Sequence, residues 1–377
     1  MEFIPTRAAG LLHLERYGPR MGRFYAAHRN TDSGPGVAPT TSALSPYLRR
    51  RMILESEAVA GAMALNEEGS DKFIQEVFWR TYFKGHLETR PGLWTSYKAL
   101  VSAGHAQLER NTGLRKVYDQ AIAGQTGFEC FDDWARELVA ANWLHNHTRM
   151  WFASIWIFTL GLPWALGADF FMQHLVDGDP ASNTLSWRWV AGLHTRGKTY
   201  AARAENIRRY TDGRYDPVGL NEDPVALEED DPPSPQPLPK SAVPPAADVA
   251  LLLHNDDLHP ESLDLGPARV VRVSALLPPP EGFAPAVAAF NSAAMADALS
   301  RAAAHFGCPV IDATPGWAGG LPIITPWAPV GPAADAMPAG VARLRRRWDD
   351  AVWPRSTKGF FQVKAAIPRL LDDSQFR

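Results

Sequence analysis

Residues 142–192 read NWLHNHTRMWFASIWIFTLGLPWALGADFFMQHLVDGDPASNTLSWRWVAG, and this stretch decides what the chain can fold into. Its apolar runs have the composition of buried helices, and they alternate with the polar segments H-N-x-x-R-M, D-G-D and W-R-W. Buried polar groups must be paired, so a plain hydrophobic core does not hold this many amides, charges and indoles. We therefore expect a mainly α-helical domain that builds a ligand pocket from this stretch.

The spacing of the polar residues predicts two helices that contribute to the pocket. Asn146, Arg149 and Met150 stand at i, i+3 and i+4, so they share one helix face. Asp179 precedes a proline, a pattern typical of an N-cap followed by the first helical residue. Asp177 needs a partner if it is buried, and Arg149 is the nearest cation that could supply one.

The composition is that of an ordinary globular protein. The chain has 377 residues, enough for two domains, with 46% hydrophobic and 21% charged residues. Cys130 and Cys308 are its two cysteines, which predicts no disulfide framework and favours a reducing, cytoplasmic compartment. They cannot form a four-cysteine iron–sulfur cluster, and we predict no metal site. The first residues lack the layout of a signal peptide, and the apolar run 150–166 is short and interrupted, so we expect no membrane span.

The charge distribution restricts where nucleic acid could bind. The net charge is −3, and residues 1–216 carry 25 Lys and Arg against 22 Asp and Glu, whereas the remainder is acidic. Because phosphate attraction supplies non-specific affinity, any DNA-binding surface must be local and lie in the first part. The basic clusters at 49–51 and 203–214 are candidates, but solvated helix faces explain them equally well.

A helix is predicted around 11–25, and a second helix from Ser45, which precedes a proline, to about Leu65. Thr41, Ser42 and Ser45 would then place hydroxyl and backbone N–H groups at a helix N-terminus, where the macrodipole favours an anion such as a diphosphate. Alone this signal is weak, because Ser and Thr cap many helices that bind no ligand.

Residues 71–87, DKFIQEVFWRTYFKGHL, predict an amphipathic helix. Glu76, Trp79 and Arg80 stand at i, i+3 and i+4 on the side away from its apolar face. One interpretation is a surface Glu–Arg pair beside an exposed tryptophan. The other is a face that contacts a substrate, and we prefer it because an isolated exposed tryptophan is uncommon.

The rest of the chain predicts a second domain after a linker. A polar connection leads to helices at about 107–122 and 129–141, and the first domain ends at residue 216. Residues 217–247 are acidic and proline-rich, as in a linker. Residues 248–377 predict a small α/β domain with strands at 249–254, 268–273, 309–313 and 321–325, a long helix at 285–306 and helices near 338–351 and 363–372.

The motifs H-N-x-x-R-M, D-G-D-x-A-x-N and W-x-W, in this order, resemble the FAD-binding domain of the DNA photolyase/cryptochrome family. T-S-x-L-S at 41–45 and E-x-x-W-R at 76–80 resemble two further segments of that domain. The resemblance covers about residues 3–216 and implies an all-helical photolyase-type FAD-binding domain, here followed by a small α/β unit. We expect the family's usual N-terminal α/β antenna domain to be missing and the C-terminal unit to be its relocated counterpart. Any antenna chromophore stays unidentified.

The resemblance implies a role for each pocket residue. The residues expected to hold a bent, non-covalent FAD are Tyr25, Thr41, Ser42, Ala43, Leu44, Ser45, Arg80, Trp143, Asn146, Arg149, Asp177, Asp179 and Asn183. The residues expected to act in catalysis are Glu76, Trp79, Asn146, Met150 and Asn183, and those expected to contact DNA are Glu76, Trp79 and Trp189. The Asn183 amide would accept a hydrogen bond from flavin N5, and Met150 would favour cyclobutane dimers.

Repair in this family is electron transfer from photoexcited reduced FAD to a flipped pyrimidine dimer, whose ring then splits. The resemblance therefore implies a deoxyribodipyrimidine photo-lyase-like carbon–carbon lyase that acts on ultraviolet-damaged DNA. The alternative is a non-enzymatic, cryptochrome-like blue-light photoreceptor that signals to a protein partner. Fold analogy alone does not choose between them.

Two positions depart from the family pattern. Trp187 and Trp164 match the inner two members of the family's electron-transfer chain, but Ala121 stands where the outer tryptophan would be, so the electron could leave through nearby Tyr118. His147 stands where many members have arginine. We expect a weakened or pH-dependent phosphate contact there, because imidazole titrates near neutrality.

Overall fold

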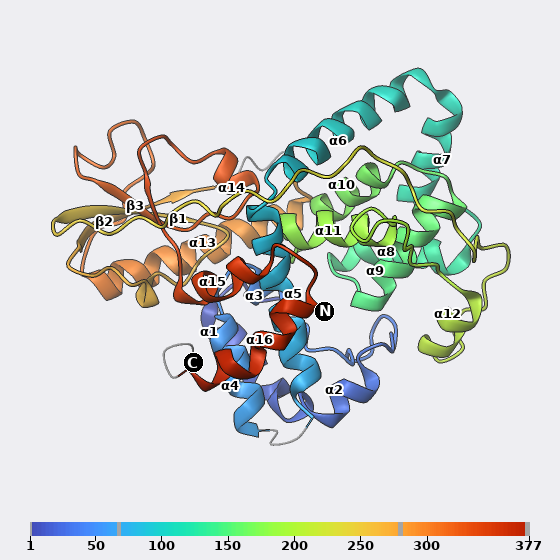
Figure 1. Cartoon of the computed structure of the whole chain (residues 1–377), viewed down its shortest axis with the longest axis horizontal. Coiled ribbons are helices and arrows are strands. Elements are labelled where there is room, and N and C mark those ends of the chain that lie inside the picture. Colours follow the sequence, from blue (N-terminus) through green and yellow to red (C-terminus); the bar gives the residue numbers. More distant parts are fainter. Residues whose placement is uncertain (1, 66–68, 278–281, 374–377) are drawn as a thin grey trace. The chain divides into compact units, whose positions relative to one another are not determined.

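The computed structural model describes residues 2–65, 69–277 and 282–373 (Figure 1). Its contacts form two compact units, which we treat separately. The first unit contains residues 24–43 and 91–234, and the second contains residues 3–23, 44–90 and 235–373. The boundaries expected at residues 216 and 247 rest on composition, and they stay predictions.

The first unit is helical. Its helices are α6 (Gly92–Arg110), α7 (Thr112–Ile122), α8 (Glu129–Ala141), α9 (Asn146–Ser154), α10 (Trp164–His174), α11 (Pro180–Val190) and α12 (Ala204–Tyr210), with most of α2 (Arg23–His28). Asn111 caps α7 by accepting a hydrogen bond from the Leu114 backbone N–H at 3.0 Å. After α9 the backbone makes a π-helical turn, Ile155–Thr159, before α10 begins. The apolar run 150–166 is thus not one continuous helix.

Helix α6 occupies residues that we assigned to a polar connection, and the helix expected at 107–122 is divided between the end of α6 and α7. Leu93, Tyr97 and Leu108 are buried on it, and Gly104 lies against α10, where an added Cβ would come within 2.9 Å of Leu166. Gly104 therefore allows a close contact between the two helices.

The predicted linker has irregular backbone in both units, but its first half is fixed to helix α11. The Arg188 guanidinium forms an ion pair with Glu229, and Leu227 donates a backbone hydrogen bond to Ala191 at 3.0 Å. An added Cβ on Gly192 would come within 2.6 Å of Ala226. Residues 226–229 are therefore packed against the helix that carries the W-R-W segment.

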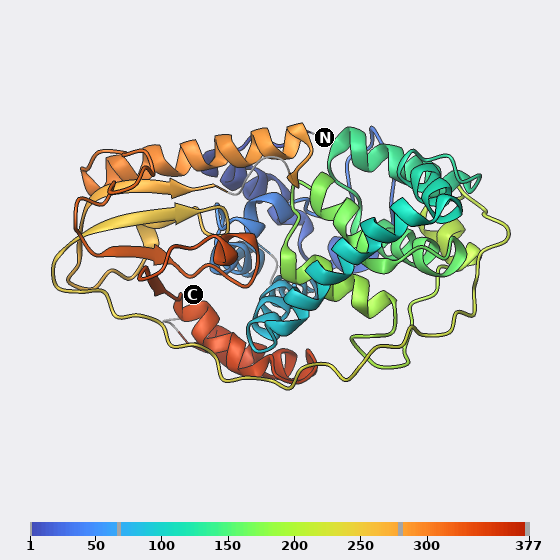
Figure 2. The ribbon, with the colours of Figure 1, turned by 90° about the horizontal axis from the view of Figure 1, so that it is seen from above.

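The second unit contains a four-stranded parallel sheet in the order β2-β1-β3-β4. Its strands are β1 (Asp248–His254), β2 (Arg269–Leu276), β3 (Ile323–Pro326) and β4 (Ala342–Leu344). Helix α13 (Pro285–Phe306) connects β2 to β3 and lies along one face of the sheet (Figure 2). The expected strand at 309–313 is only a bridge between Val310 and Val273, and the expected helix at 338–351 contains β4 and the shorter α15 (Arg347–Val352).

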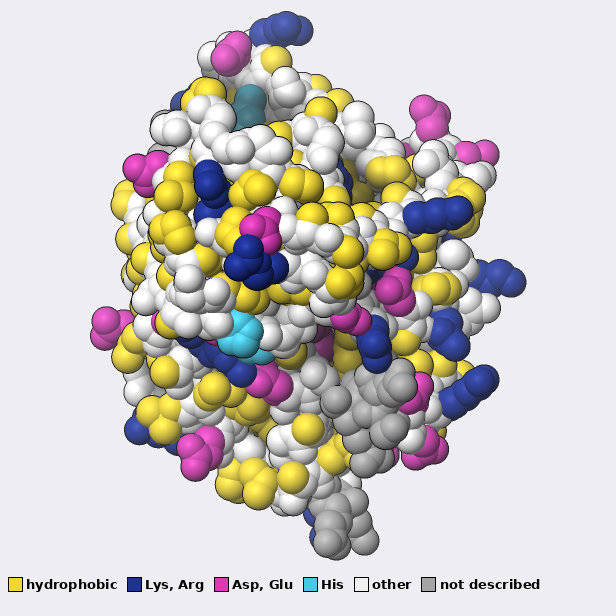
Figure 3. Space-filling view, turned by 90° about the vertical axis from the view of Figure 1, so that its left-hand side faces the viewer, with side chains coloured by type: hydrophobic (Ala, Val, Ile, Leu, Met, Phe, Trp, Pro, Cys, Tyr) yellow, Lys and Arg dark blue, Asp and Glu magenta, His cyan; other side chains and the backbone are white. Residues whose placement is uncertain are grey.

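Figure 3 shows the side of the molecule on which the sheet of this unit lies. In Figure 3 basic and acidic side chains alternate among hydrophobic ones, so the side drawn there presents no continuous basic stripe among the described residues. This agrees with the acidic balance of the C-terminal part of the sequence.

Helices from both ends of the chain complete the second unit. They are α1 (Arg7–Tyr17), α3 (Ser45–Arg49), α4 (Glu55–Leu65), α5 (Asp71–Glu88), α14 (Pro332–Asp335), α15 and α16 (Phe361–Asp372), with short 3-10 turns at Gly18–Arg20, Pro260–Ser262 and Trp353–Arg355. The helix expected from Ser45 to Leu65 is interrupted, because Arg51 adopts a left-handed conformation with φ +49°. Helix α5 packs against α15, α16 and the turn at Trp353.

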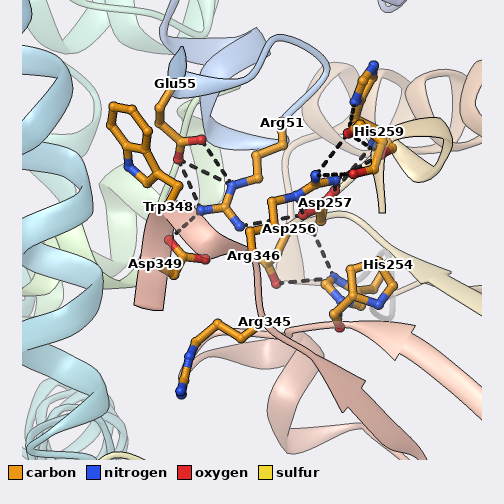
Figure 4. Close-up of polar contacts among 12 residues, drawn as sticks. Arg51, Glu55, His254, Asp256, Asp257, His259, Arg345, Arg346, Trp348 and Asp349 are labelled. Atoms are coloured by element: carbon orange, nitrogen blue, oxygen red, sulfur yellow. Dashed lines mark hydrogen bonds and ion pairs between the residues drawn. The ribbon is translucent and has the colours of Figure 1, made fainter. Parts of the chain in front are cut away.

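Residues 49–51 are buried in the second unit, so neither a DNA footprint nor a solvated face describes them. Arg51 pairs with Asp349 at 2.6 Å, Glu55 at 3.2 Å and Asp257 at 3.4 Å (Figure 4). Arg346 pairs with the same Asp257 at 2.6 Å. Burial alone would raise the pKa of Asp257, but the guanidinium groups of Arg346 and Arg51 hold it well below its usual range. These charges join the end of strand β1 to helices α3, α4 and α15.

Candidate functional site

The centre of the candidate site is an ion pair between helix α9 and the segment before α11, both in the first unit. Arg149 Nη2 lies 2.9 Å from Asp177 Oδ2, and Arg149 Nε donates to the Leu144 carbonyl at 3.0 Å. The Asp177 side chain is 1% exposed, whereas that of Arg149 is 23% exposed. The pair expected from the sequence is therefore present, and its guanidinium keeps an accessible part.

Helix α11 begins as the sequence predicts. Asp179 is its N-cap and accepts a hydrogen bond from the Ser182 backbone N–H at 2.8 Å. One turn further on, Asn183 is buried, and its Nδ2 donates to the Ala168 carbonyl at 2.8 Å. This bond uses one of the two amide N–H groups and orients the side chain, and Oδ1 is the atom suited to accept a hydrogen bond from a ligand.

The other predicted residues of the first unit differ in exposure. Tyr25 and Ala43 are buried, and Ala43 has a left-handed backbone with φ +49°. On helix α9, Asn146 is exposed and Met150 is half-buried. Four further predicted residues of the first unit are also half-buried: Thr41, Ser42, Trp143 and Trp189. A mixture of buried and accessible polar groups is what a ligand pocket requires, but the ligand roles of these residues stay predictions.

The helix expected to cradle a diphosphate is short. Helix α3 has five residues, Leu44 occupies its N-cap position without a side-chain cap, and Ser45 is its first residue. So short a helix has little macrodipole, so the argument from the helix N-terminus was wrong. A contribution of Leu44 and Ser45 to cofactor binding then rests on the resemblance alone.

Trp79 on helix α5 is neither fully exposed nor isolated, so the interpretation as an exposed tryptophan beside a surface pair is wrong, and the preferred substrate contact stays a prediction. The tryptophan is half-buried, and its ring stacks on Phe360 with the centroids 3.8 Å apart and the planes at 14°. Tyr82 contacts its edge at 5.4 Å. Glu76 on the same helix is exposed and Arg80 is half-buried. The sequence could not indicate Phe360, because it stands far from Trp79 in the chain and belongs to no motif.

His147 does not face solvent or titrate near neutrality, so the expected pH-dependent phosphate contact is wrong. It is buried, stacks on Trp151, and hydrogen-bonds the Asn30 carbonyl at 3.0 Å and the Tyr200 hydroxyl at 2.9 Å. Burial lowers the pKa of His147 to about 4. The imidazole is neutral at physiological pH and holds helix α9 in place.

The two predicted electron-transfer tryptophans are both buried, but they lie in different surroundings. Trp187 contacts Trp156, which the sequence did not single out, with the centroids 6.3 Å apart. Trp164 instead packs against Tyr97 at 5.8 Å. Trp156 lies in an apolar run that looks like ordinary core, so no sequence signal distinguished it.

Among the described residues, no cluster of three His, Cys, Asp or Glu side chains is arranged to hold a metal ion. Within the same residues, none of the helices has the length and hydropathy needed to cross a bilayer.

Comparisons with known proteins agree with the motifs. Residues 73–219 match the sequence model of a family described as the FAD binding domain of DNA photolyase. A deoxyribodipyrimidine photo-lyase from Streptomyces griseus is 33% identical over 184 residues, which are 45% of this chain and 38% of that protein. The Escherichia coli deoxyribodipyrimidine photo-lyase is 28% identical over 199 residues, 52% of this chain and 42% of that protein. The chain thus spans less than half the length of these relatives.

Solved structures with partial similarity include a Synechocystis cryptochrome, with a TM-score of 0.48, 23% identity and coverage of 56% of this chain and 44% of that chain. A class III photolyase from Agrobacterium tumefaciens has a TM-score of 0.46, 24% identity and coverage of 55% and 43%.

Proposed function

Residues 73–219 belong to the DNA photolyase family of FAD-binding domains, and from this premise we propose that the chain binds FAD and repairs cyclobutane pyrimidine dimers in light. The observation that carries the proposal is the Arg149–Asp177 ion pair at 2.9 Å. The Asp177 carboxylate of this pair is buried just before helix α11 begins. An apolar core gains little from such a pair, because desolvation offsets its attraction. A charged, hydrogen-bonding ligand beside it gives the pair a function.

The donor set of the first unit fits a flavin. Arg149 offers an accessible guanidinium to a carbonyl oxygen, and Asn183 offers an oriented amide oxygen to a ring N–H. Asp179 would hold the ribose or adenine end, and Thr41 and Ser42 offer hydroxyls to phosphates. When bound, FAD would supply blue-light absorption and a single electron. The protein's part is to bind it and to hold Asn183 in a fixed orientation.

Each of the two units carries residues proposed to contact the substrate. In the second unit, Glu76 on helix α5 is exposed and could accept hydrogen bonds from a base edge. In the first unit, Asn146 on helix α9 is exposed and could do the same. Trp79 would stack on a flipped pyrimidine, and base–aromatic stacking is worth about 1–3 kcal/mol per base. In this conformation Phe360 occupies that stacking position, so a dimer that binds Trp79 has to replace it.

The same contact favours the second candidate function, a blue-light photoreceptor. Phe360 directly precedes α16, which packs on α5, so a change at Trp79 would release or hold a C-terminal helix. In a photoreceptor this helix would be the output that a protein partner reads. In a repair enzyme it would be a cover that damaged DNA displaces.

The deciding experiment measures repair of dimer-containing oligothymidylate by reduced, FAD-loaded full-length protein under blue light. Recovered thymine absorbance that is missing in the dark control supports repair. Trp79→Ala should abolish dimer-specific binding without loss of FAD, and Phe360→Ala should strengthen binding, because it removes the competing ring. No repair with bound, photoactive FAD, together with light-dependent proteolysis of residues 356–372, would favour the photoreceptor.

A further inference from the structure

Trp187 and Trp156 are held in direct contact by a glycine. Their rings meet edge to face, with the centroids 6.3 Å apart and the planes at 87°. An added Cβ on Gly167 would lie 2.3 Å from the Trp187 ring and 2.9 Å from the Trp156 ring, so the residue between the two indoles must lack a side chain. Trp187 stands one turn after Asn183 on helix α11, next to the proposed flavin site. The glycine thus brings a second indole against the tryptophan nearest that site.

The contact continues from Trp156 toward the surface. Trp156 is fully buried in the π-helical turn, and its Nε1 donates to the Pro163 carbonyl at 3.0 Å, which fixes the ring. Such π turns are frequent at functional sites. The Trp156 ring then meets Tyr118 edge to face at 5.9 Å, and Tyr118 is half-buried on helix α7. Three oxidisable rings therefore form a continuous path from the core to the surface of the first unit.

Trp164 offers a poorer path for a positive charge. The Arg188 guanidinium lies over its ring, 6.0 Å from the centroid, and repels a positive charge there, although its partner Glu229 offsets part of this repulsion. Its ring neighbour Tyr97 is buried, with a hydroxyl that has no hydrogen-bond partner among the described residues. A phenol that cannot pass on its proton is hard to oxidise. In the described part of the chain, no cation stacks on Trp156.

We propose that Trp187, Trp156 and Tyr118 are the electron-transfer chain of this protein, with Trp156 taking the second position and Tyr118 the last. This inference rests on the proposed function, because repair needs reduced FAD, and the chain would supply the electron that converts photoexcited oxidised FAD toward that state. Trp187 gives up one electron, Trp156 then donates an electron to the oxidised Trp187, and Tyr118 donates an electron to the oxidised Trp156. Tyr118 then loses its phenolic proton to solvent and becomes a neutral radical. An external thiol returns one electron and one proton to it.

The surroundings of Tyr118 suit the last position. Burial raises the pKa of its phenol, and the Asp169 and Asp119 carboxylates raise it further. The same negative charges stabilise a positive charge on the ring before the proton leaves. Asp169 is also 3.3 Å from His105 Nε2, and His105 contacts the Tyr118 ring edge to face. Each can accept a proton at the surface end of the path.

The test uses the full chain loaded with oxidised FAD, with flavin content measured by absorbance, and frozen after illumination for electron paramagnetic resonance. We expect a tyrosyl radical signal in the unaltered protein. Tyr118→Phe should remove this signal and leave only a short-lived tryptophan radical in transient absorption. Trp156→Phe should remove both the tyrosyl signal and the long-lived charge separation. Trp164→Phe is the matched control and should keep the tyrosyl signal.

The outcomes separate this inference from the proposed function. Loss of the signal in Trp164→Phe, with an unchanged signal in Trp156→Phe, would overturn the path. If Trp156→Phe fails to fold, the half-buried Tyr118→Phe variant decides alone, because an unchanged tyrosyl signal there would also overturn it. A chain that binds no FAD contradicts both proposals. Bound FAD with a Tyr118 radical but no dimer repair contradicts only the proposed function.

Discussion

Replacing Arg51 by methionine should destabilise the second unit far more than removal of an exposed ion pair. The Arg51 guanidinium contacts Asp349, Glu55 and Asp257, and all four side chains are at most 2% exposed. Methionine fills similar space but leaves Glu55 and Asp349 without this cation. Removing one partner of a buried ion pair costs about 3–5 kcal/mol, a large share of a typical unfolding free energy of roughly 5–15 kcal/mol.

The control is Arg269→Met in the same unit. Arg269 pairs with Asp248 at 2.7 Å, but its side chain is 75% exposed, so solvent screens the pair and its loss should change the unfolding free energy little. Urea unfolding followed by far-UV circular dichroism gives both free energies. Adding Asp349→Asn to Arg51→Met should recover part of the loss, because it removes a stranded charge.

The pH dependence gives a second check on Arg51→Met. Burial already raises the pKa of Asp349, and Arg51 is the group that opposes this shift. Without Arg51 the carboxyl is protonated over a wider pH range in the folded protein. A raised native pKa means stability that is present below the unfolded pKa and lost as pH rises, so the deficit should grow from pH 4 toward pH 8. A deficit no larger than that of Arg269→Met, or one that is constant with pH, would refute this reasoning.

Three further results are expected. Asp177→Asn should weaken FAD retention by about 10–100-fold, because a charged hydrogen bond is worth roughly 1.5–3 kcal/mol, and flavin absorbance after gel filtration measures it; full retention would remove Asp177 from the site. Burial raises the pKa of Glu88 to about 7, so the unaltered protein should lose up to about 3 kcal/mol as pH rises from 4.5 to 7, and Glu88→Gln should flatten that urea-unfolding profile. Burial lowers the pKa of His147 to about 4, so its contribution to the free energy of unfolding is complete above about pH 6.5 and is lost as the pH falls toward 4. Nuclear magnetic resonance of its ring protons should therefore show no titration between pH 6 and 8, and a titration midpoint near 6.5 would contradict its burial.

The sequence by itself determined the features that depend on local order. The start of α11 at Asp179 follows from an N-cap before proline, and the Arg149–Asp177 pair follows from two charges that have few other partners in their stretch. Strand β1 follows from a short, continuously apolar run and strand β2 from a short run rich in valine, whereas their parallel pairing was not predicted. Motif order was enough to indicate the family of residues 73–219.

Only the tertiary structure decided which distant side chains meet. From the sequence, Arg51 looks like part of a surface cluster, but in the structure it is buried against Asp257 and Asp349. The sequence likewise does not show that the Phe360 ring stacks on Trp79. From the sequence, Trp156 looks like an ordinary core residue, whereas in the structure Gly167 allows its ring to contact Trp187. Periodicity and caps act within a few residues of the chain, whereas burial and ring contacts depend on packing between segments that are far apart in sequence. Local sequence therefore determined where many of the elements lie, whereas long-range packing determined where several of them break and which side chains meet.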